Sequence, residues 1–402
     1  MENVRRVALL LGQDIGYCRE VLRGVQQYSV HRKQWVFRDA PPEAGTLEPL
    51  REWRPHGIIA LLFHAEVAAA LTRLKVPLVN TTSTLSKWDI PLVEADHAAV
   101  GRMAAEYFLG KGYRHFGFFG SAWTHVSRTR EEGYRARLAE AGFGLATCHA
   151  EYLPRPPVGA SWRHVDDTVQ RWLRSLPKPV AILCSNDVPA RDLADACRQL
   201  DVNVPQEVSL LGVDNDELEC GLTWPSLSSI ELPAQRIGYE AARLLDELMQ
   251  GKKKKRPAEP LFLPPVRVVT RQSTDTRAVD NPVVAAALDF IRANLSREFT
   301  VDDVATGAGV GRRDLERKFR SALDRSVLDE VRAARVDRVR QLLTDTELSM
   351  AAIAQRAGFS GARRMSVVFR EATGTTPRHY RRRLRHQRLG DAASGGDLGA
   401  AR

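Results

Sequence analysis

The chain has 402 residues, of which 44% are hydrophobic and 27% charged, and its formal net charge is +10 at pH 7. This length exceeds one ordinary hydrophobic core and predicts two or three globular domains. The longest uncharged apolar run, Gly57–Phe63, is far shorter than the ~20 residues of a membrane helix, which excludes a membrane-spanning protein.

The N-terminal residues 1–6 run directly into a short apolar stretch and lack the apolar region and cleavage site of a signal peptide. A cytoplasmic location is therefore expected. The five cysteines are widely spaced and form no CxxC motif, so we expect reduced, mostly buried thiols. They are Cys18, Cys148, Cys184, Cys197 and Cys220.

Residues 7–270 alternate short β-branched or apolar runs with amphipathic stretches. The runs are typical of strands buried on both faces: Val7–Leu11, Gly57–Leu62, Val76–Asn80, His115–Gly120, Val180–Cys184 and Val208–Val213. Helical patterns lie between several of them, at His97–Lys111, Arg128–Ala141, Pro189–Leu200 and Ala234–Gln250. This alternation predicts doubly wound parallel sheets, and about 270 residues favours two α/β lobes with a cleft between them. Ligands of such sheets bind outside the carboxyl ends of the strands.

The sequence pattern changes after residue 271. Residues 272–281 are polar and strandless, and Pro282 suits the first turn of a helix, so we interpret this segment as a linker. Only helical patterns follow. We therefore predict an effector-type domain at 1–271, a helical domain at 282–388 and a disordered tail at 389–402, which is rich in Gly, Ala, Ser and Asp.

The helical part contains an internal repeat of 49 residues. Ala305-Thr-Gly-Ala-Gly309-Val310 recurs as Ala354-Gln-Arg-Ala-Gly358-Phe359. Each copy follows a short amphipathic helix and precedes an apolar i,i+4 pair, Leu315/Phe319 and Met365/Phe369. A helix, a glycine turn and a second helix with one apolar seam are the layout of a helix-turn-helix unit, so two units are predicted. A long helix at Ser326–Thr344 joins them, with Leu328, Val331, Val339 and Leu342 on its apolar side.

The basic excess is concentrated in this part. Residues 282–388 hold 22 Lys and Arg against 13 Asp and Glu, whereas residues 1–281 hold 36 against 34. A local basic excess suits nucleic-acid binding, because neutralising phosphates releases counterions and supplies sequence-independent affinity.

Two known families are similar to the two parts. The stretch Ile353-Ala354, Ala357-Gly358-Phe359, Phe369-Arg370, Gly374-Thr375-Thr376-Pro377 and Tyr380-Arg381 resembles the AraC/XylS-type DNA-binding domain, although Met365 stands where that family usually has an aromatic residue. Ser185-Asn186-Asp187, Val204–Ser209, Gly212–Asn215 and Pro225–Ile230 resemble the LacI/GalR effector domain, which is similar to periplasmic sugar-binding proteins. In that domain, Asn is frequent where this chain has His97. This order of domains resembles the xylose-operon regulator (XylR-like) family. The resemblance implies a sugar-responsive regulator with D-xylose or another pentose as effector, and an activator of a sugar catabolic operon.

Five polar residues lie at predicted strand ends or at the starts of the following helices: Asp96, Arg130, Asn186, Asp187 and Asp214. Sugar sites need polar groups that fix hydroxyls and an apolar face that covers the ring. By resemblance to the effector family, Arg130 and Asp214 match positions that hold sugar hydroxyls, as a donor fork and as an acceptor. For the other three residues, helix N-capping is the alternative.

Three tryptophans in predicted loops are candidates to stack on a ring, with ordinary packing as the alternative: Trp88, Trp123 and Trp224.

The second helix of each repeat carries charge on its outward face. By position in the matching motif, the base readers are Arg313, Glu316 and Arg317 in the first unit and Arg363, Arg364 and Ser366 in the second, with Arg312 placed for phosphate. Arg381 and Arg382 are further candidates for phosphate contacts. A solvated charged face is the alternative throughout.

An enzyme is the competing class. The chain has no HExxH, Gly-x-Ser-x-Gly, P-loop or GxGxxG motif, so neither enzymatic activity nor a metal or cofactor is expected. The alternative that stays open is a cytoplasmic sugar-binding protein or enzyme without sequence-specific DNA binding. The expected partners are double-stranded operator DNA, a sugar effector, RNA polymerase and a second copy of the chain, with no membrane.

Overall fold

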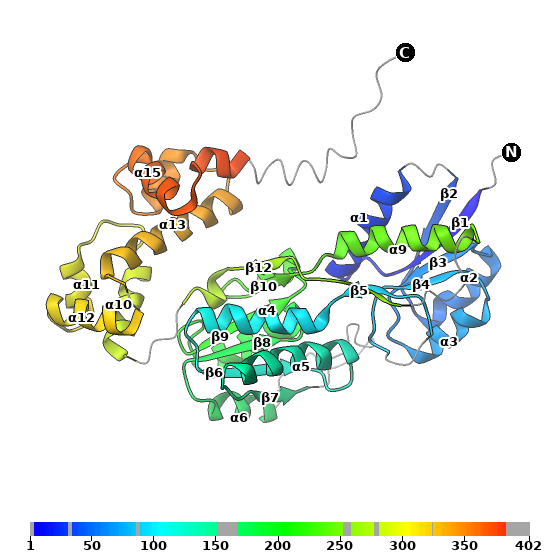
Figure 1. Cartoon of the computed structure of the whole chain (residues 1–402), viewed down its shortest axis with the longest axis horizontal. Helices are drawn as coiled ribbons and strands as arrows, with labels where there is room; N and C mark the ends of the chain where they lie inside the picture. The colour runs from blue at the N-terminus through cyan, green and yellow to red at the C-terminus, as the bar shows by residue number, and fades with distance from the viewer. Residues whose placement is uncertain are drawn as a thin grey trace, which may run out of the picture. The chain divides into compact units, whose positions relative to one another are not determined.

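The computed structural model describes residues 4–30, 34–85, 89–150, 167–251, 259–276, 281–323 and 325–382. The chain divides into two compact units, Met1–Ala278 and Val279–Arg402 (Figure 1). Within the described residues, every strand belongs to the first unit and the second unit is built from helices. No helix in these segments is long and apolar enough to cross a membrane. The predicted fold class, an α/β part followed by an all-α part, is confirmed.

A parallel sheet of four strands, in the order β2-β1-β3-β4, forms the first lobe of the first unit. Its elements are β1 (Arg5–Leu10), α1 (Gly16–Ser29), β2 (Trp35–Asp39), η1 (Ala44–Thr46), α2 (Leu47–Trp53), β3 (Gly57–Ala60), α3 (Ala65–Arg73), β4 (Leu78–Asn80) and α9 (Ala234–Met249). Although α9 comes late in the chain, it packs on α1. A Cβ atom at Gly24 would lie 1.8 Å from the carbonyl oxygen of Gln235, so glycine lets the two helices pack backbone against backbone.

The second lobe is built on a sheet of six strands in the order β12-β10-β9-β8-β6-β7. All neighbours are parallel except β12, which is antiparallel to β10. Its elements are α4 (His97–Gly110), β6 (His115–Gly120), α5 (His125–Glu140), β7 (Ala146–His149), α6 (Asp167–Ser175), β8 (Val180–Cys184), α7 (Asp187–Gln199), β9 (Val208–Val213), α8 (Glu217–Leu222), β10 (Ser228–Glu231), β12 (Arg267–Val269) and η2 (Gln272–Thr274).

Two short parallel strands, β5 (Val93–Ala95) and β11 (Leu261–Leu263), lie between the two lobes (Figure 1). The chain enters the second lobe through β5, returns to the first lobe for α9, and leaves it again through β11. Both lobes therefore contain segments that are far apart in sequence, and residues next to β5 lie where the lobes meet.

The six strands predicted from apolar runs are present, and β3, β8 and β9 are buried along their whole length. The remaining strands were not predicted, because they are short or carry polar residues, as the exposed β2 does. All five cysteines are free and buried, as expected.

The start of the predicted linker is packed on the first unit. Ser273 and Thr274 of η2 are fully buried, and the Ser273 hydroxyl donates to the carbonyl oxygen of Leu210 at 2.6 Å. It also accepts from the backbone N–H of Ser228 at 2.8 Å. The polarity of this segment therefore reflects hydrogen bonding to the sheet edge. Residues 277–280 lie outside the described segments, as does the predicted tail at 389–402.

The second unit contains α10 (Pro282–Ala293), α11 (Val301–Gly307), α12 (Arg312–Leu323), α13 (Val327–Asp345), α14 (Met350–Arg356) and α15 (Ala362–Thr373), and residues 377–382 are also helical. It has two small cores, one in each repeat. Leu315 and Phe319 lie in the first core and Met365 and Phe369 in the second, all fully buried. The pairs predicted as seams are thus confirmed.

Both cores share α13, the predicted long helix. Its N-terminal half contributes Val327 and Val331 to the first core, and its C-terminal half contributes Val339 and Leu342 to the second. Leu328, which was expected on the apolar side, is 47% exposed, and its neighbour Val327 takes the buried place. The capping box formed by Ser326 with Asp329 starts the helix at Val327, which lies one turn before the buried Val331 on the same face.

Candidate ligand site and DNA-binding surface

The candidate ligand site is centred on Arg130 of α5, a charged side chain that is only 2% exposed. Close packing of α4 against α5 places it there. A Cβ atom at Gly101 would lie 2.2 Å from the carbonyl oxygen of Arg130, and one at Gly133 would lie 2.2 Å from that of Ala98. Glycine at both positions lets the helices approach closely enough for Arg130 to reach the first residue of α4.

Arg130 is held by groups from three other segments. Its Nε donates to Nδ1 of His97 at 3.2 Å, and its Nη1 donates to the backbone carbonyl of Ser185, directly after β8. Its Nη2 lies 3.7 Å from Oδ1 of Asp214, directly after β9. Burial lowers the pKa of Arg130, and the charges of Asp214 and Glu94 oppose that change. A buried guanidinium with such partners is held rigidly, and several of its N–H groups remain for a ligand.

His97 and Glu94 continue this network into β5. His97 Nε2 lies 3.0 Å from Oε1 of Glu94. Because Nδ1 accepts from Arg130, Nε2 must carry the proton and donate to Glu94. Burial lowers the pKa of His97 and so does the Arg130 charge, which keeps the ring neutral near pH 7.

Glu94 is 1% exposed. Burial alone would raise its pKa, but the hydrogen bonds from His97 and from the backbone N–H of Ser83 lower it below its ordinary value. Ser83 belongs to the loop after β4, in the first lobe. Glu94 is therefore an ionised carboxylate that connects both lobes to Arg130.

Asp214 and Asn186 form the other side of the site. The Asn186 side-chain amide donates to Oδ2 of Asp214 at 2.6 Å. Asp214 has φ 108, a conformation that side chains rarely adopt, and its side chain is 17% exposed. Burial raises the pKa of Asp214, and the Arg130 charge opposes that rise. At 3.7 Å from Arg130, Oδ1 makes no direct hydrogen bond to it and keeps its capacity to accept one.

The other two predicted ligand residues have local partners. Asp96 is the N-cap of α4 and accepts from the backbone N–H of Ala99 at 2.8 Å. Asp187 is buried and accepts from the Ser229 hydroxyl at 2.5 Å and from the Asp216 backbone N–H at 2.8 Å. Burial raises the pKa of Asp187, and so does the nearby Asp214. The structure thus brings Arg130, Asn186 and Asp214 together, while Asp96 caps a helix and Asp187 supports the turn after β9.

Residues of α1 reach this turn from the first lobe. Arg19 lies 3.2 Å from Oδ2 of Asp216, and a Cβ atom at Gly16 would lie only 2.0 Å from the same oxygen. The hydroxyl of Tyr17, between them, donates to the carbonyl oxygen of Thr81 at 2.9 Å. Burial raises the pKa of Tyr17, and the charges of Glu94 and Asp214 raise it further, so this ring lies close to the buried network.

Sequence reasoning missed Glu94 and Tyr17, and it noted His97 without giving it a role. A carboxylate inside the apolar run Val93-Glu94-Ala95 was the available signal, because charged residues are seldom fully buried without a function or a partner. Of the candidate tryptophans, Trp123 and Trp224 are 74% and 68% exposed, and Trp88 lies outside the described residues. In the described segments, no group of His, Cys, Asp or Glu is arranged to hold a metal ion.

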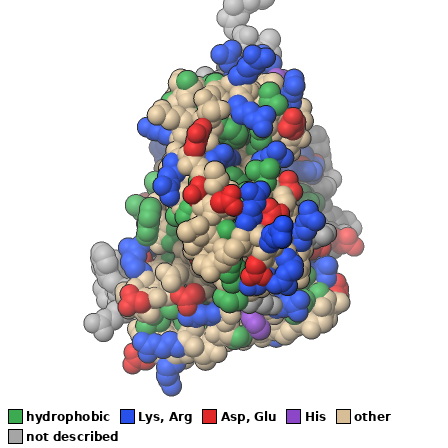
Figure 2. All heavy atoms as spheres, turned by 90° about the vertical axis from the view of Figure 1, so that its left-hand side faces the viewer, with side chains coloured by type: hydrophobic (Ala, Val, Ile, Leu, Met, Phe, Trp, Pro, Cys, Tyr) green, Lys and Arg blue, Asp and Glu red, His purple; other side chains and the backbone are tan. Residues whose placement is uncertain are grey.

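The predicted base readers lie on α12 and α15. Arg313 and Arg317 are exposed on α12, and Arg363 and Arg364 are exposed in the first turn of α15. Arg317 pairs with Asp314 at 2.5 Å. On the face of the molecule in Figure 2, Lys and Arg side chains are interspersed with acidic ones, so this face is not uniformly positive.

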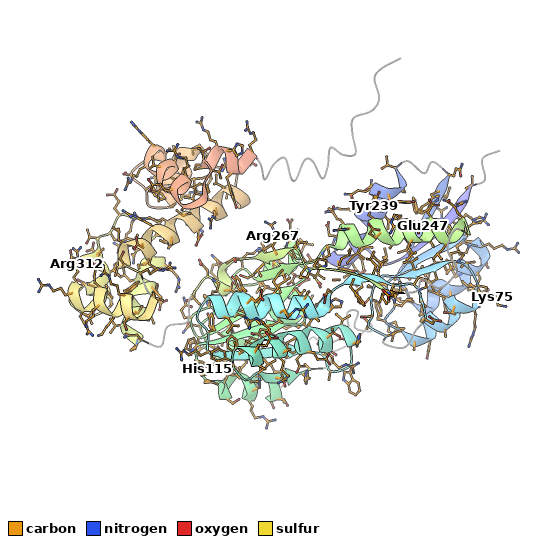
Figure 3. The ribbon with its side chains drawn as sticks, viewed as in Figure 1. Lys75, His115, Tyr239, Glu247, Arg267 and Arg312 are labelled. Atoms are coloured by element: carbon orange, nitrogen blue, oxygen red, sulfur yellow. The ribbon has the colours of Figure 1, made fainter. Side chains whose placement is uncertain are left out.

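Three further candidates are partly engaged. Arg312 extends from the start of α12 (Figure 3) and pairs with Asp302 at 3.1 Å and with Glu316 at 3.8 Å. Ser366 donates to the carbonyl oxygen of Ala362, one turn earlier in α15, at 2.8 Å. For these side chains to contact DNA, the ion pairs of Arg312 and the hydrogen bond of Ser366 must break, or the same groups must bind DNA as a second partner.

Arg381 is placed differently from the expectation of a phosphate contact. Its guanidinium donates to the carbonyl oxygens of Leu348 at 2.7 Å and Thr346 at 3.4 Å, in the loop between α13 and α14. Arg381 therefore stabilises the second repeat by joining its last helix to the loop between α13 and α14. The neighbouring Arg382 is exposed and contacts only its helix neighbour His379 among the described residues.

The two repeats contact each other through Arg335 in the middle of α13. Its guanidinium lies 5.2 Å from the Phe299 ring of the first repeat and 6.0 Å from the Phe359 ring of the second. Gly358, in the turn of the second repeat, lies against the loop between α10 and α11, because a Cβ atom there would be 2.3 Å from the carbonyl oxygen of Leu295. The spacing of α12 and α15 is therefore fixed by packing as well as by α13.

Comparisons with known proteins agree with both parts. Residues 105–274 match the family described as a periplasmic binding protein-like domain, and residues 304–383 match a helix-turn-helix domain. The xylose operon regulatory protein of Escherichia coli (strain K12) is 29% identical over 385 residues, covering 94% of this chain and 96% of that protein. The protein of the same name in Haemophilus influenzae is 26% identical, covering 94% and 99%.

Solved structures give the same result. The xylose-binding transcription activator XylR has a TM-score of 0.73 and 27% identity, over 95% of this chain and 98% of that one. A LacI family regulator from Enterococcus faecium with bound ribose has a TM-score of 0.55 and 18% identity over 68% of this chain, which shows the fold alone. The two xylose operon regulatory proteins and the XylR structure are similar to the chain over nearly its whole length. The chain therefore resembles the XylR-like transcription regulators, with a periplasmic-binding-protein-like domain followed by a helix-turn-helix domain.

Proposed function

We propose that this protein is a sugar-responsive transcription regulator that binds a pentose such as D-xylose and activates a sugar catabolic operon. One observation supports a polar effector above all: the buried Arg130 guanidinium, fixed by His97 and Ser185, presents its remaining donors beside the open acceptor of Asp214. The names of the relatives support a pentose as the effector, because the regulators that are similar over nearly the whole chain are named for xylose or its operon.

The effector contacts are proposed as follows. Arg130 donates to adjacent hydroxyls, while Asp214 and Asn186 bind a further hydroxyl from the opposite side. Asp96 and Asp187 belong to the same set of candidate effector-binding residues. Their present hydrogen bonds favour indirect roles, in which Asp96 fixes the start of α4 and Asp187 fixes the turn that carries Asp214.

The DNA contacts are proposed on the two second helices of the repeats. Arg313, Glu316 and Arg317 read one half-element and Arg363, Arg364 and Ser366 read the other, with Arg312 on a phosphate. Arginine suits this role because its fork matches the O6 and N7 acceptors of guanine. The different side chains of α12 and α15 predict two unlike half-elements.

The proposal also covers the location, the oligomeric state and the partners of the protein. The protein acts in the cytoplasm as a homodimer without enzymatic activity, and it contacts RNA polymerase at the promoter. Effector binding shifts the population of the two lobes towards one arrangement, because a ligand changes an equilibrium only through its preference for one state.

A gel shift with operator-containing DNA, run over a salt series with and without pentoses, tests the proposal. A sugar-dependent shift that competitor DNA does not remove supports it, whereas sugar binding without sequence-specific DNA binding would support the sugar-binding-protein alternative. Turnover of the sugar in the same mixture would instead indicate an enzyme.

A further inference from the structure

The buried carboxylate of Glu94 has one oxygen that the network described above does not use. Oε1 accepts from His97 Nε2 at 3.0 Å and from the Ser83 backbone N–H at 2.5 Å. Oε2 is buried and has no hydrogen-bond partner within the described residues, although the side chain is only 2% exposed. Leaving a charged acceptor buried and unsatisfied is unfavourable, so such a group in a native protein calls for an explanation.

Glu94 is part of the candidate ligand site and not an isolated core residue. The His97 ring contacts both Arg130, at 3.2 Å, and Glu94, at 3.0 Å, so a single ring separates the two side chains. The hydrogen bonds of Glu94 come from the loop after β4 in the first lobe and from α4 in the second. A ligand that reaches Arg130 between the lobes therefore comes within reach of this carboxylate.

The charges of this site argue for a neutral ligand. Arg130 is its one buried cation among the described residues, because His97 is held neutral between Arg130 and Glu94. Asp214 lies 3.7 Å from the guanidinium, and Glu94 lies on the other side of the His97 ring that the guanidinium contacts. A sugar acid or sugar phosphate would add an anion beside these carboxylates, for which the described residues supply one buried cation. Like charges at short range in a buried site repel strongly.

We infer that Glu94 is a further effector contact, whose Oε2 accepts a hydroxyl proton of the sugar, and that it makes the site selective for neutral sugars over sugar acids and sugar phosphates. This inference rests on the proposed sugar-binding function of the same site. An oxygen that lacks a partner takes a hydroxyl donor without displacing an existing bond. An anionic ligand can offer the same hydroxyl, but it adds a negative charge beside the carboxylate, which opposes its binding.

Titration calorimetry on the full-length chain tests the inference. The probes are D-xylose, L-arabinose and D-ribose as neutral sugars, and xylonate and ribose 5-phosphate as anions. The wild-type protein is expected to bind at least one neutral sugar at least ~10-fold more tightly than either anion, which needs no variant.

Glu94→Gln keeps the size of the side chain and removes its charge. It is expected to weaken the neutral sugar at least ~10-fold, because a hydrogen bond to a charged acceptor is lost, and to strengthen the anions relative to the wild type. The matched control is Glu106→Gln on the exposed side of α4, whose carboxylate pairs with Arg137 at 3.6 Å and which should bind every probe as the wild type does.

A purely structural role for Glu94 would have another signature. It would lower the affinity for all probes by the same factor, and it would do so equally for each monodeoxy form of the best sugar. A contact to one hydroxyl instead predicts one deoxy sugar that the wild type and Glu94→Gln bind equally well.

The failures are distinguishable. If no probe binds the wild-type protein, the proposed sugar-binding function is overturned and this inference with it. If the wild type binds a neutral sugar but Glu94→Gln binds it equally well, or if the wild type prefers the anions, this inference alone is overturned.

Discussion

At the scale of single residues, one buried cation determines what the candidate site can bind. Arg130 has a partner for Nε and another for Nη1, and both partners come from segments distant in sequence, His97 and Ser185. These bonds orient the guanidinium before a ligand arrives, which reduces the entropy lost on binding. The remaining donors and the open oxygen of Asp214 are the groups left for the ligand.

Removing either member of this pair should abolish tight effector binding. Breaking a buried, charged hydrogen bond costs about 2–5 kcal/mol, so Arg130→Ala or Asp214→Ala should weaken the sugar at least ~30-fold in calorimetry. DNA binding without effector should persist in a gel shift. Arg135→Ala, on the same helix but paired with Glu131 at the surface, is the control. Well-folded variants with unchanged sugar affinity would place the site elsewhere.

His97 should make stability depend on pH. Its folded-state pKa lies below the ordinary value of 6.5, so the unfolded chain takes up the proton first as the pH falls. The unfolded state then binds more protons, and the free energy of unfolding falls as the pH drops from about 7 through 6.5. The nearby Glu94 titrates below its ordinary value of 4.5, outside this window.

His97→Gln should remove that part of the pH dependence while keeping a side chain of similar reach. Chemical denaturation of both proteins between pH 7.5 and 5.5 measures the difference, in which other histidines such as His56 cancel. Parallel curves for the two proteins would show that His97 does not titrate as inferred.

At the scale of elements, the two repeats share a pattern but differ in their surroundings. Gly309 and Gly358 occupy equivalent turns with φ 69 and φ 68, which explains the glycine in both copies. Only Gly358 is also in close contact with the other repeat, next to Arg335 and Leu295. The repeat is therefore visible in the sequence, whereas its asymmetry is not.

This difference predicts unequal costs for the same substitution. Gly309→Ala meets open space and should cost about 1–2 kcal/mol from the backbone conformation alone. Gly358→Ala has the same conformational cost and also collides with the Leu295 carbonyl oxygen, so its unfolding free energy should fall further. Denaturant unfolding of the two variants checks this. Equal losses would mean that the contact between the repeats contributes nothing.

The recognition helices predict two separable effects on DNA binding. Arg317→Ala should cost about 1–3 kcal/mol on the cognate operator and relax base preference in one half-element, and Arg364→Ala should do so in the other. The exposed Arg382 should act on all sequences alike, so Arg382→Ala should lower the salt slope by about one. Arg381→Ala is expected instead to destabilise the second repeat, because it removes two hydrogen bonds to the loop after α13.

A binding selection over randomised sites measures these preferences. The base-reading assignment in the first repeat would be withdrawn if Arg317→Ala and Arg382→Ala changed specific and non-specific affinity equally.

At the scale of the whole molecule, the two units, Met1–Ala278 and Val279–Arg402, have separate cores. The first unit is completed by the segment after β12, since Ser273 and Thr274 are buried against its sheet. The segment that leads towards the second unit is therefore packed on the first unit as far as Thr274.

Two fragments of the first unit should therefore differ in stability. A fragment of residues 1–278, about 30 kDa by the average residue mass, should fold and bind the effector. A fragment of residues 1–271 lacks the Ser273 hydrogen bonds to Leu210 and Ser228 and should melt at a lower temperature. Limited proteolysis of the full chain should yield the longer fragment. If the two fragments melted at the same temperature, the first domain would end at residue 271, as the sequence predicts.

The sequence by itself determined the features that depend on local patterns. Apolar runs such as Val180–Cys184 predicted the buried strands, because a strand covered on both faces is made mostly of apolar residues. The spaced pairs Leu315/Phe319 and Met365/Phe369 predicted the two repeats, because an apolar i,i+4 pair specifies one face of a helix. The family resemblance then pointed to Arg130 and Asp214, which the structure brings to within 3.7 Å of each other.

Only the tertiary structure decided which polar groups use one another. Arg130 finds its partners 33 and 55 residues away, and no spacing rule relates such positions. The same holds for Arg381, whose carbonyl partners lie 33 and 35 residues earlier, and for Ser273, whose acceptor lies 63 residues earlier. A hydrogen bond is local in space and is satisfied by whichever group the fold brings near. Sequence patterns therefore predict where a polar side chain is placed, and the folded chain decides what it binds.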